Sequence, residues 1–189
     1  MNVNLVEQID KYIKEYIGFM NINKFPEYKL QTKEVSLDIS EKQGYESIAE
    51  TIYNVENGTH TLLISTNLEL SKYVAFHEFT HMLDAEMYTY GDKMRYMGLS
   101  GFTEYHASQI ELLQLLGASS VDKVKSFSMS TVINAISGQK CVSQYLAEKQ
   151  EHSISLFCRA DFPANINTLK SAFGVLFNYF GLRSICEMY

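Results

Sequence analysis

The sequence predicts an α+β fold with a helical C-terminal part, and three patterns support this prediction. An amphipathic helix comes first, strand-like segments follow it, and apolar residues with helical spacing fill most of the rest. With 189 residues, of which 46% are hydrophobic, the chain can bury a core and has a globular composition. We expect a core domain over residues 1–120 and a helical subdomain over residues 121–189 packed on it.

The first expected elements are a helix and a strand. Apolar residues recur at intervals of three and four over residues 4–22, which predicts an amphipathic helix. Within residues 28–40 the apolar side chains of Val35, Leu37 and Ile39 alternate with polar ones. That alternation predicts a half-buried strand.

Residues 47–66 are expected to form two further strands joined by a tight turn. The pair Asn57-Gly58 favours a type I′ turn, in which both central residues have positive φ. The second strand, residues 61–65, is β-branched and apolar, as a central strand would be. With the preceding strand, these segments predict a small three-stranded sheet.

Helical patterns take over after the predicted sheet. A helix is expected over residues 68–87, with Asn67 as its N-cap. Residues 88–101 contain three glycines and no clear period, so we expect a surface loop there. A further helix is expected over residues 103–116, with Gly117 as its C-terminal stop.

The last third of the chain is predicted to be helical, in about three segments. Breaks between these segments are expected at residues 137–138 and 161–163, where glycine and proline occur. This region also holds the three cysteines, an odd number without CxxC spacing. We therefore expect no disulfide framework and no zinc knuckle, but reduced, buried thiols in a cytoplasmic protein.

Charge and hydropathy exclude several classes of protein. The formal net charge is −6, which argues against a groove for nucleic acid, since phosphate binding needs clustered Lys and Arg. No run of 18 apolar residues is present, so a transmembrane helix is not expected. The N-terminus lacks a basic segment followed by a continuous apolar one, so we expect no secretory signal.

An HExxH motif, His77-Glu78-Phe79-Thr80-His81, falls within the helix expected over residues 68–87. Residues i and i+4 lie one turn apart on the same helix face, so both imidazoles can reach a single metal ion. Zinc accepts neutral histidine nitrogens at about 2.0–2.1 Å. Glu78 is offset around the helix and can reach a water at the ion without being a ligand, so it is the candidate general base.

A catalytic zinc site needs a third protein ligand and one open position. Glu104, 23 residues after His81, is the better candidate, because a helix, a loop and a second helix can bring a first-turn carboxylate to face the histidines. Asp84 is the competitor, but a ligand three residues beyond His81 would crowd the open position. We expect Asp84 either to accept a hydrogen bond behind the ligands or to face solvent.

Residues 61–116 resemble the ImmA/IrrE family of zinc peptidases. That family has a strand, a short link, an HExxH helix and a second helix that opens with Glu-x-x-Ala. This chain has TLLISTNLELSKYVAFHEFTH, then Glu104 and Ala107 before the apolar run QIELLQLL. Phe79 and Thr80 stand where the family has a HELGH-like motif. The resemblance implies a zincin-like fold and a cytoplasmic, gluzincin-like peptidase, and known members of the family cut a repressor protein.

Further polar residues near the motif have two interpretations each. His106 could stabilise the oxyanion of a tetrahedral intermediate, or be a surface or capping residue. The remaining histidines, His60 and His152, offer no metzincin-type third ligand. The loop residues could contact substrate or could simply pack; they are Tyr88, Tyr90, Arg95 and Tyr96.

Two functions follow from these observations. The first is a zinc-dependent peptidase, in which His77, His81 and Glu104 bind Zn²⁺ and Glu78 is the base. Its partner would be a protein or peptide substrate, with no nucleic acid and no membrane involved. The alternative is a non-catalytic regulatory module on a zincin scaffold, whose helical C-terminal part binds a protein.

Overall fold

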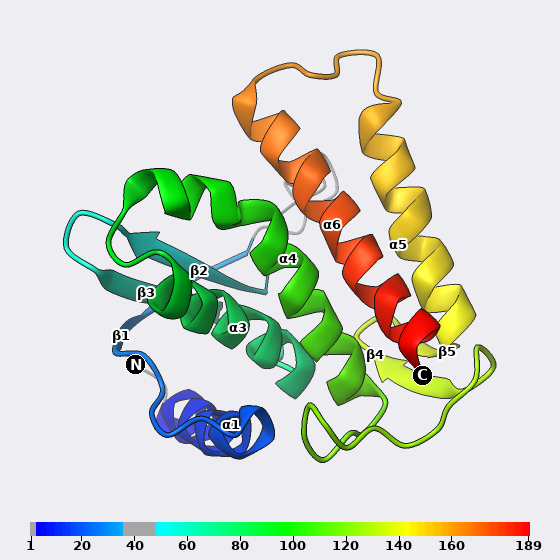
Figure 1. Cartoon of the computed structure of the whole chain (residues 1–189), viewed down its shortest axis with the longest axis horizontal. Helices are drawn as coiled ribbons and strands as arrows, with labels where there is room; N and C mark the ends of the chain where they lie inside the picture. The colour runs from blue at the N-terminus through cyan, green and yellow to red at the C-terminus, as the bar shows by residue number, and fades with distance from the viewer. Residues whose placement is uncertain (1–2, 36–47) are drawn as a thin grey trace. The chain divides into compact units, whose positions relative to one another are not determined.

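The computed structural model describes residues 3–35 and 48–189, and its contacts divide the chain into two compact units, Met1–Met97 and Gly98–Tyr189. The described residues form five helices, one three-stranded sheet and one two-stranded sheet (Figure 1). This confirms the predicted α+β class, whereas the predicted domains 1–120 and 121–189 stay a prediction. None of the helices in the described ranges has the length and apolar character needed to cross a membrane.

The first unit begins with the predicted amphipathic helix. This helix, α1 (Val3–Met20), packs against α3 (Lys72–Tyr88), the helix that carries the HExxH motif. Its buried stripe includes Ile9, Tyr16 and Phe19, which are seven and three residues apart and so lie on one face of the helix. The stripe provides the surface on which α3 lies.

The sheet of the first unit has the order β1-β3-β2, and this confirms the predicted three strands. The strands are β1 (Tyr28–Lys33), β2 (Ala49–Asn54) and β3 (Thr59–Ser65). Central β3 pairs in parallel with β1 and antiparallel with β2. Of the residues that predicted the first strand, Val35 lies just beyond β1, and Leu37 and Ile39 lie outside the described residues.

The predicted hairpin between β2 and β3 is confirmed, but its turn is not of type I′. Four residues, 55–58, separate the two strands, and of these only Gly58 has a positive φ, 64°. Asn57 instead accepts hydrogen bonds through Oδ1 from the N–H and the hydroxyl of Thr59, at 3.2 and 2.6 Å. The asparagine side chain thus stabilises the turn, and its backbone does not need the left-handed conformation.

Helix α3 begins at Lys72 with Ser71 as its N-cap, so the prediction of Asn67 as N-cap was wrong. Asn67 Oδ1 accepts from the backbone N–H of Val35 at 3.0 Å, and its Nδ2 donates to the carbonyl of Val35 at 2.8 Å. The hydroxyl of Ser65 also donates to Oδ1, at 2.8 Å. The amide of Asn67 therefore holds the ends of β1 and β3 together, and the helix starts after it.

Helix α4 (Lys93–Leu115) begins ten residues before the predicted position 103, so the surface loop expected over residues 88–101 was wrong for most of its length. Asp92 explains the early start. Its Oδ1 accepts from the backbone N–H groups of Met94 and Arg95 at 2.7 and 3.1 Å, which satisfies the first turn of the helix.

The second unit contains a hairpin that was not predicted. Strands β4 (Val132–Ala135) and β5 (Gly138–Cys141) pair antiparallel, so the expectation of an all-helical region over residues 121–189 was wrong here. The break expected at residues 137–138 is the turn of this hairpin, with φ of 104° at Gly138. The break at residues 161–163 is confirmed, since it separates α5 (Val142–Phe157) from α6 (Ile166–Met188).

Two glycines bring α4 and α6 into close contact within the second unit (Figure 1). A Cβ atom added at Gly181 of α6 would lie 2.1 Å from the carbonyl oxygen of Tyr105 on α4. A Cβ added at Gly101 of α4 would lie 2.7 Å from the ring of Phe177 on α6. These distances are shorter than van der Waals contact, so both positions need glycine for this packing.

The three cysteines are free thiols, and they all lie in the second unit. The prediction that they are buried was wrong. Cys141 and Cys186 are half-buried, and Cys158 is exposed.

Candidate metal centre

The three chemically active residues of the HExxH motif lie together in the middle of α3. One ligand atom each from His77, Glu78 and His81 can be chosen so that all lie within 4.8 Å of one another. The centroids of the two imidazole rings are 4.8 Å apart, with 79° between the ring planes. Both histidines are half-buried and Glu78 is 9% exposed. Two imidazoles and a carboxylate in this arrangement are donors of the kind zinc prefers, so the group could hold a metal ion.

Phe79, the third residue of the motif, fixes α3 in the core on the side away from the histidines. It is fully buried, and its ring lies edge-to-face against Phe25 and Tyr16, with centroid distances of 4.9 and 5.5 Å. Because Phe79 is offset by about 200° from His77 around the helix, burial of its ring leaves the imidazoles on the opposite face.

Thr80 adds a buried hydrogen-bond chain between α3 and α1. Its hydroxyl donates to the carbonyl of Phe76 at 2.8 Å, so its oxygen accepts from the hydroxyl of Tyr16 at 3.0 Å. Burial raises the pKa of Tyr16 far above its usual range, so this hydroxyl keeps its proton. Phe79 and Thr80, the two residues that differ from the HELGH-like pattern, thus both serve the packing of α3 on α1.

The sheet contacts the motif from a different direction. Thr51 of β2 donates from Oγ1 to the backbone carbonyl of Glu78 at 3.0 Å. The sequence analysis did not single out Thr51, because a threonine in a strand has no spacing relation to a helix that follows more than twenty residues later. Only the packing of β2 on α3 makes this contact visible.

Glu104 lies on the part of α4 that belongs to the second unit. Its side chain packs beside α6, since a Cβ added at Gly174 would lie 3.6 Å from Glu104 Oε1. The group that could hold a metal ion among the described residues consists of α3 residues alone. The role of Glu104 as third ligand therefore stays a prediction.

Asp84 is 1% exposed, so the expectation that it could face solvent was wrong. Its negative charge adds to the effect of burial in raising the pKa of Tyr16, which places Asp84 near α1. It is not part of the group on α3 described above. Its predicted role as a hydrogen-bond acceptor behind the metal ligands stays a prediction.

Among the described residues, the other histidines are not members of this group. His60 of β3 is 1% exposed, stacks on Tyr53 with 4.6 Å between ring centroids, and places Nε2 3.4 Å from Glu86 Oε2. Burial lowers the pKa of His60 despite this carboxylate. His106 of α4 lies beside Phe102, with 5.8 Å between ring centroids, and its proposed oxyanion role stays a prediction.

Some of the tyrosines from the end of α3 to the first turns of α4 pack against neighbouring side chains. Tyr96 lies edge-on to Tyr53, with 5.2 Å between ring centroids. Tyr90 is 76% exposed, and the guanidinium of Arg95 lies 5.3 Å from its ring centroid. Tyr88, the last residue of α3, is 43% exposed. Contact of these residues with substrate stays a prediction.

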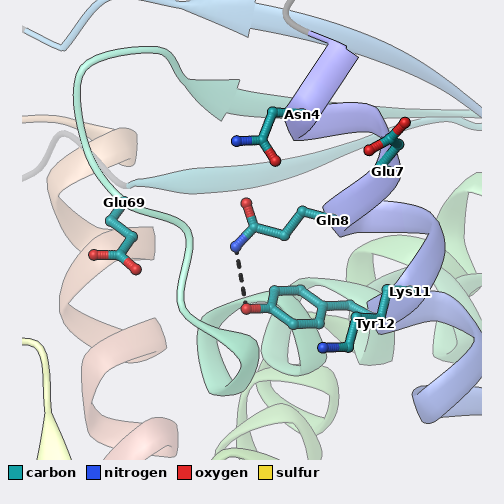
Figure 2. A pocket seen from close by; sticks show the side chains of 6 residues that line it. All are labelled: Asn4, Glu7, Gln8, Lys11, Tyr12 and Glu69. Carbon is teal, nitrogen blue, oxygen red and sulfur yellow. Dashed lines mark hydrogen bonds between the residues drawn. The ribbon is translucent and has the colours of Figure 1, made fainter.

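A polar hollow of about 480 Å³ lies beside the start of α1, away from the motif residues (Figure 2). Gln8 lines this hollow, and its Nε2 donates hydrogen bonds to the hydroxyl of Tyr12 at 3.1 Å and to the carbonyl of Leu70 at 3.0 Å. The second bond fixes the residues just before α3, so Gln8 supports the start of the motif helix. The lining residues are Asn4, Glu7, Gln8, Lys11, Tyr12 and Glu69.

No protein-family model, curated protein or solved structure matches this chain. The functional argument therefore depends on the residues themselves and on the geometry of α3.

Proposed function

We propose that this chain is a zinc-dependent metallopeptidase that hydrolyses a peptide bond in a protein substrate. The observation that carries the proposal is the position of His77, Glu78 and His81 on one turn of α3, with ligand atoms within 4.8 Å. In this proposal His77, His81 and Glu104 bind the metal. The two histidines are supported by their geometry, and Glu104 is supported by its place in the sequence.

Glu78 is the general base of the proposed reaction. Zinc, when bound, would polarise the peptide carbonyl and make a water more acidic. Glu78 accepts a proton from the attacking water and then donates it to the leaving nitrogen of the peptide. Its burial supports this role, because a carboxylate shielded from bulk water interacts more strongly with a charged centre beside it.

Strand β2 supports the proposal because it has an edge to which a peptide substrate could bind. Within the described residues β2 pairs with β3 on one edge only, and it packs against the motif helix α3 (Figure 1). An extended peptide could add to the other edge through main-chain hydrogen bonds. Such a peptide would lie beside the helix that carries the base.

The resemblance of residues 61–116 to ImmA/IrrE peptidases adds two elements to the proposal. The substrate would be a regulator or repressor protein, and the enzyme would act in the cytoplasm. Both elements come from the family's known members and from no contact in this structure.

Metal content and hydrolysis together test the proposal. We expect the protein purified without chelator to carry about one zinc per chain, as a single site requires. His77→Ala should lose the metal, and Glu104→Gln should bind it more weakly. Glu78→Gln should keep the metal but should not cleave a proteome-derived peptide mixture analysed by mass spectrometry.

Two outcomes would refute the proposal. A Glu78→Gln variant as active as the wild type would refute the mechanism, and a wild type that takes up no zinc after dialysis would refute the site. Metal binding without any hydrolysis would favour the alternative, a regulatory binding module. That alternative also predicts that a protein partner is captured equally well by the metal-free protein and by Glu78→Gln.

A further inference from the structure

One side-chain hydrogen bond links β2 to the residue that carries the proposed base. Thr51 Oγ1 donates to the main-chain carbonyl of Glu78 at 3.0 Å. A carbonyl in the interior of a helix accepts from the N–H four residues later and has a second lone pair available. The hydroxyl of Thr51 therefore adds to the helical bond of Glu78 and does not compete with it.

The pairing register of the sheet directs Thr51 to α3. Thr51 lies opposite Leu62 of β3, and Leu62 is 1% exposed. Successive strand residues point to opposite faces, so the neighbours of Thr51, Glu50 and Ile52, point to the other face, where both are exposed. A slip of one residue would remove the hydroxyl from the helix entirely.

The motif is thus held by hydrogen bonds from two elements, one to the backbone of Glu78 and one to the side chain of Thr80. Strand β2 holds Glu78 through Thr51, and helix α1 holds Thr80 through the hydroxyl of Tyr16. The second contact fixes α3 in the core. The first contact acts on the proposed base residue itself and comes from β2, the strand that lies at the edge of the sheet among the described residues.

We infer that Thr51 is a positioning residue for Glu78 in the proposed peptidase reaction. The inference rests on the proposed function and names the contact that sets the base relative to the peptide-binding strand. A general base works only when its oxygen lies within about 2.6–3.2 Å of the atom whose proton it removes, so a small shift of its backbone lowers the rate. Thr51 touches neither the metal ligands nor the reacting atoms, so it acts through Glu78.

The test compares the kinetics and metal content of the full-length wild type, Thr51→Val and Thr51→Ser, with Thr61→Val as matched control. Valine keeps the shape of threonine and favours strands, so the edge of β2 should persist. Thr61 is a half-buried threonine on neighbouring β3, so its change to valine perturbs the sheet equally. All four proteins are assayed on one peptide that the wild type cleaves.

We expect Thr51→Val to lower kcat roughly three- to ten-fold, the effect of one neutral hydrogen bond, with KM changed by less than about two-fold. Thr51→Ser restores the hydroxyl and should return kcat to within about two-fold of the wild type. Thr61→Val should behave like the wild type, and zinc content should be equal in all four. If Thr51→Val fails to fold, Thr51→Ala removes the same hydroxyl and replaces it.

Three results would overturn the inference alone: equal kcat in Thr51→Val and Thr61→Val, a rise in KM without a fall in kcat, or no recovery in Thr51→Ser. A wild type that binds zinc but cleaves no peptide overturns the proposed function, and the positioning role falls with it. The activity of the wild type therefore separates the two failures.

Discussion

Substitution of Gly181 by alanine is expected to disrupt the contact between α4 and α6. The added Cβ would lie 2.1 Å from the carbonyl oxygen of Tyr105 and 3.1 Å from the Cβ of Ser108. Non-bonded carbon and oxygen atoms prefer a separation of about 3.5 Å. The helices would therefore have to move apart by more than about 1 Å, and the atom in the way is backbone, which cannot rotate aside.

The size of the effect follows from two opposing contributions. Overpacking in a well-packed region costs about 1–3 kcal/mol, and contact with backbone puts Gly181 at the upper end of this range. Alanine gains about 1 kcal/mol over glycine in a helix interior. We therefore expect Gly181→Ala to lower the free energy of unfolding by about 2 kcal/mol.

Gly174, two turns earlier in α6, provides the matched control. Its added Cβ would lie 3.6 Å from the nearest neighbouring atom, Glu104 Oε1, which is ordinary van der Waals contact. Gly174→Ala should keep the gain in helix propensity and stabilise the protein by up to about 1 kcal/mol. Urea unfolding followed by circular dichroism should thus separate two identical substitutions by about 3 kcal/mol. Coincident midpoints would refute the close approach of α4 and α6.

Three further predictions concern the first unit. Thr80→Val should lower the free energy of unfolding by about 1–3 kcal/mol, because the buried hydroxyl of Tyr16 loses its acceptor; adding Tyr16→Phe should recover part of the loss in urea unfolding. Burial lowers the pKa of His60, so its imidazole binds a proton more readily in the unfolded chain than in the folded one. The free energy of unfolding should therefore keep its full value above pH ~6.5 and decrease as the pH falls below that value. Unfolding midpoints at several pH values check this, and His60→Gln should flatten the dependence. Glu78→Gln should lower kcat by about 10²–10⁴ without loss of zinc, whereas His77→Ala should lose zinc, measured by elemental analysis.

Local patterns in the sequence were sufficient for the parts of the fold that depend on local physics. The motif lies on a helix because apolar residues repeat with helical spacing around it, and the hairpin forms because Asn57-Gly58 supplies turn chemistry. The proximity of His77 and His81 follows from i, i+4 spacing once the helix exists. These features need no information about the rest of the chain.

The errors occur where distant residues decide the structure. Gly101 was interpreted as a loop residue, yet it lies within helix α4, where the ring of Phe177 occupies the space that a side chain would take. Asn67 has the chemistry of an N-cap, but its amide binds Val35, a residue 32 positions earlier. In each case a contact with a residue distant in the sequence determines the structural role of the residue, and the local sequence does not contain that contact.

The short strands β4 and β5 escaped prediction for a different reason. Each has four residues, and Gly138 and Gln139 give β5 no apolar alternation. A pattern of period two needs several repeats before it can be distinguished from a helical one. Pairing between the two strands, visible only in three dimensions, stabilises a hairpin that neither segment predicts.

Within the motif, the residues that could hold a metal ion differ from the residues that pack the helix on α1. Phe79 and Thr80 are packing residues, because their side chains contact Tyr16 of α1. A change at these two positions must be matched by α1, whereas a change at His77 or His81 acts directly on the proposed metal ligands. Departure from the HELGH-like pattern at 79 and 80 is therefore a consequence of how α1 packs here. It does not weaken the case that His77, Glu78 and His81 perform zinc chemistry.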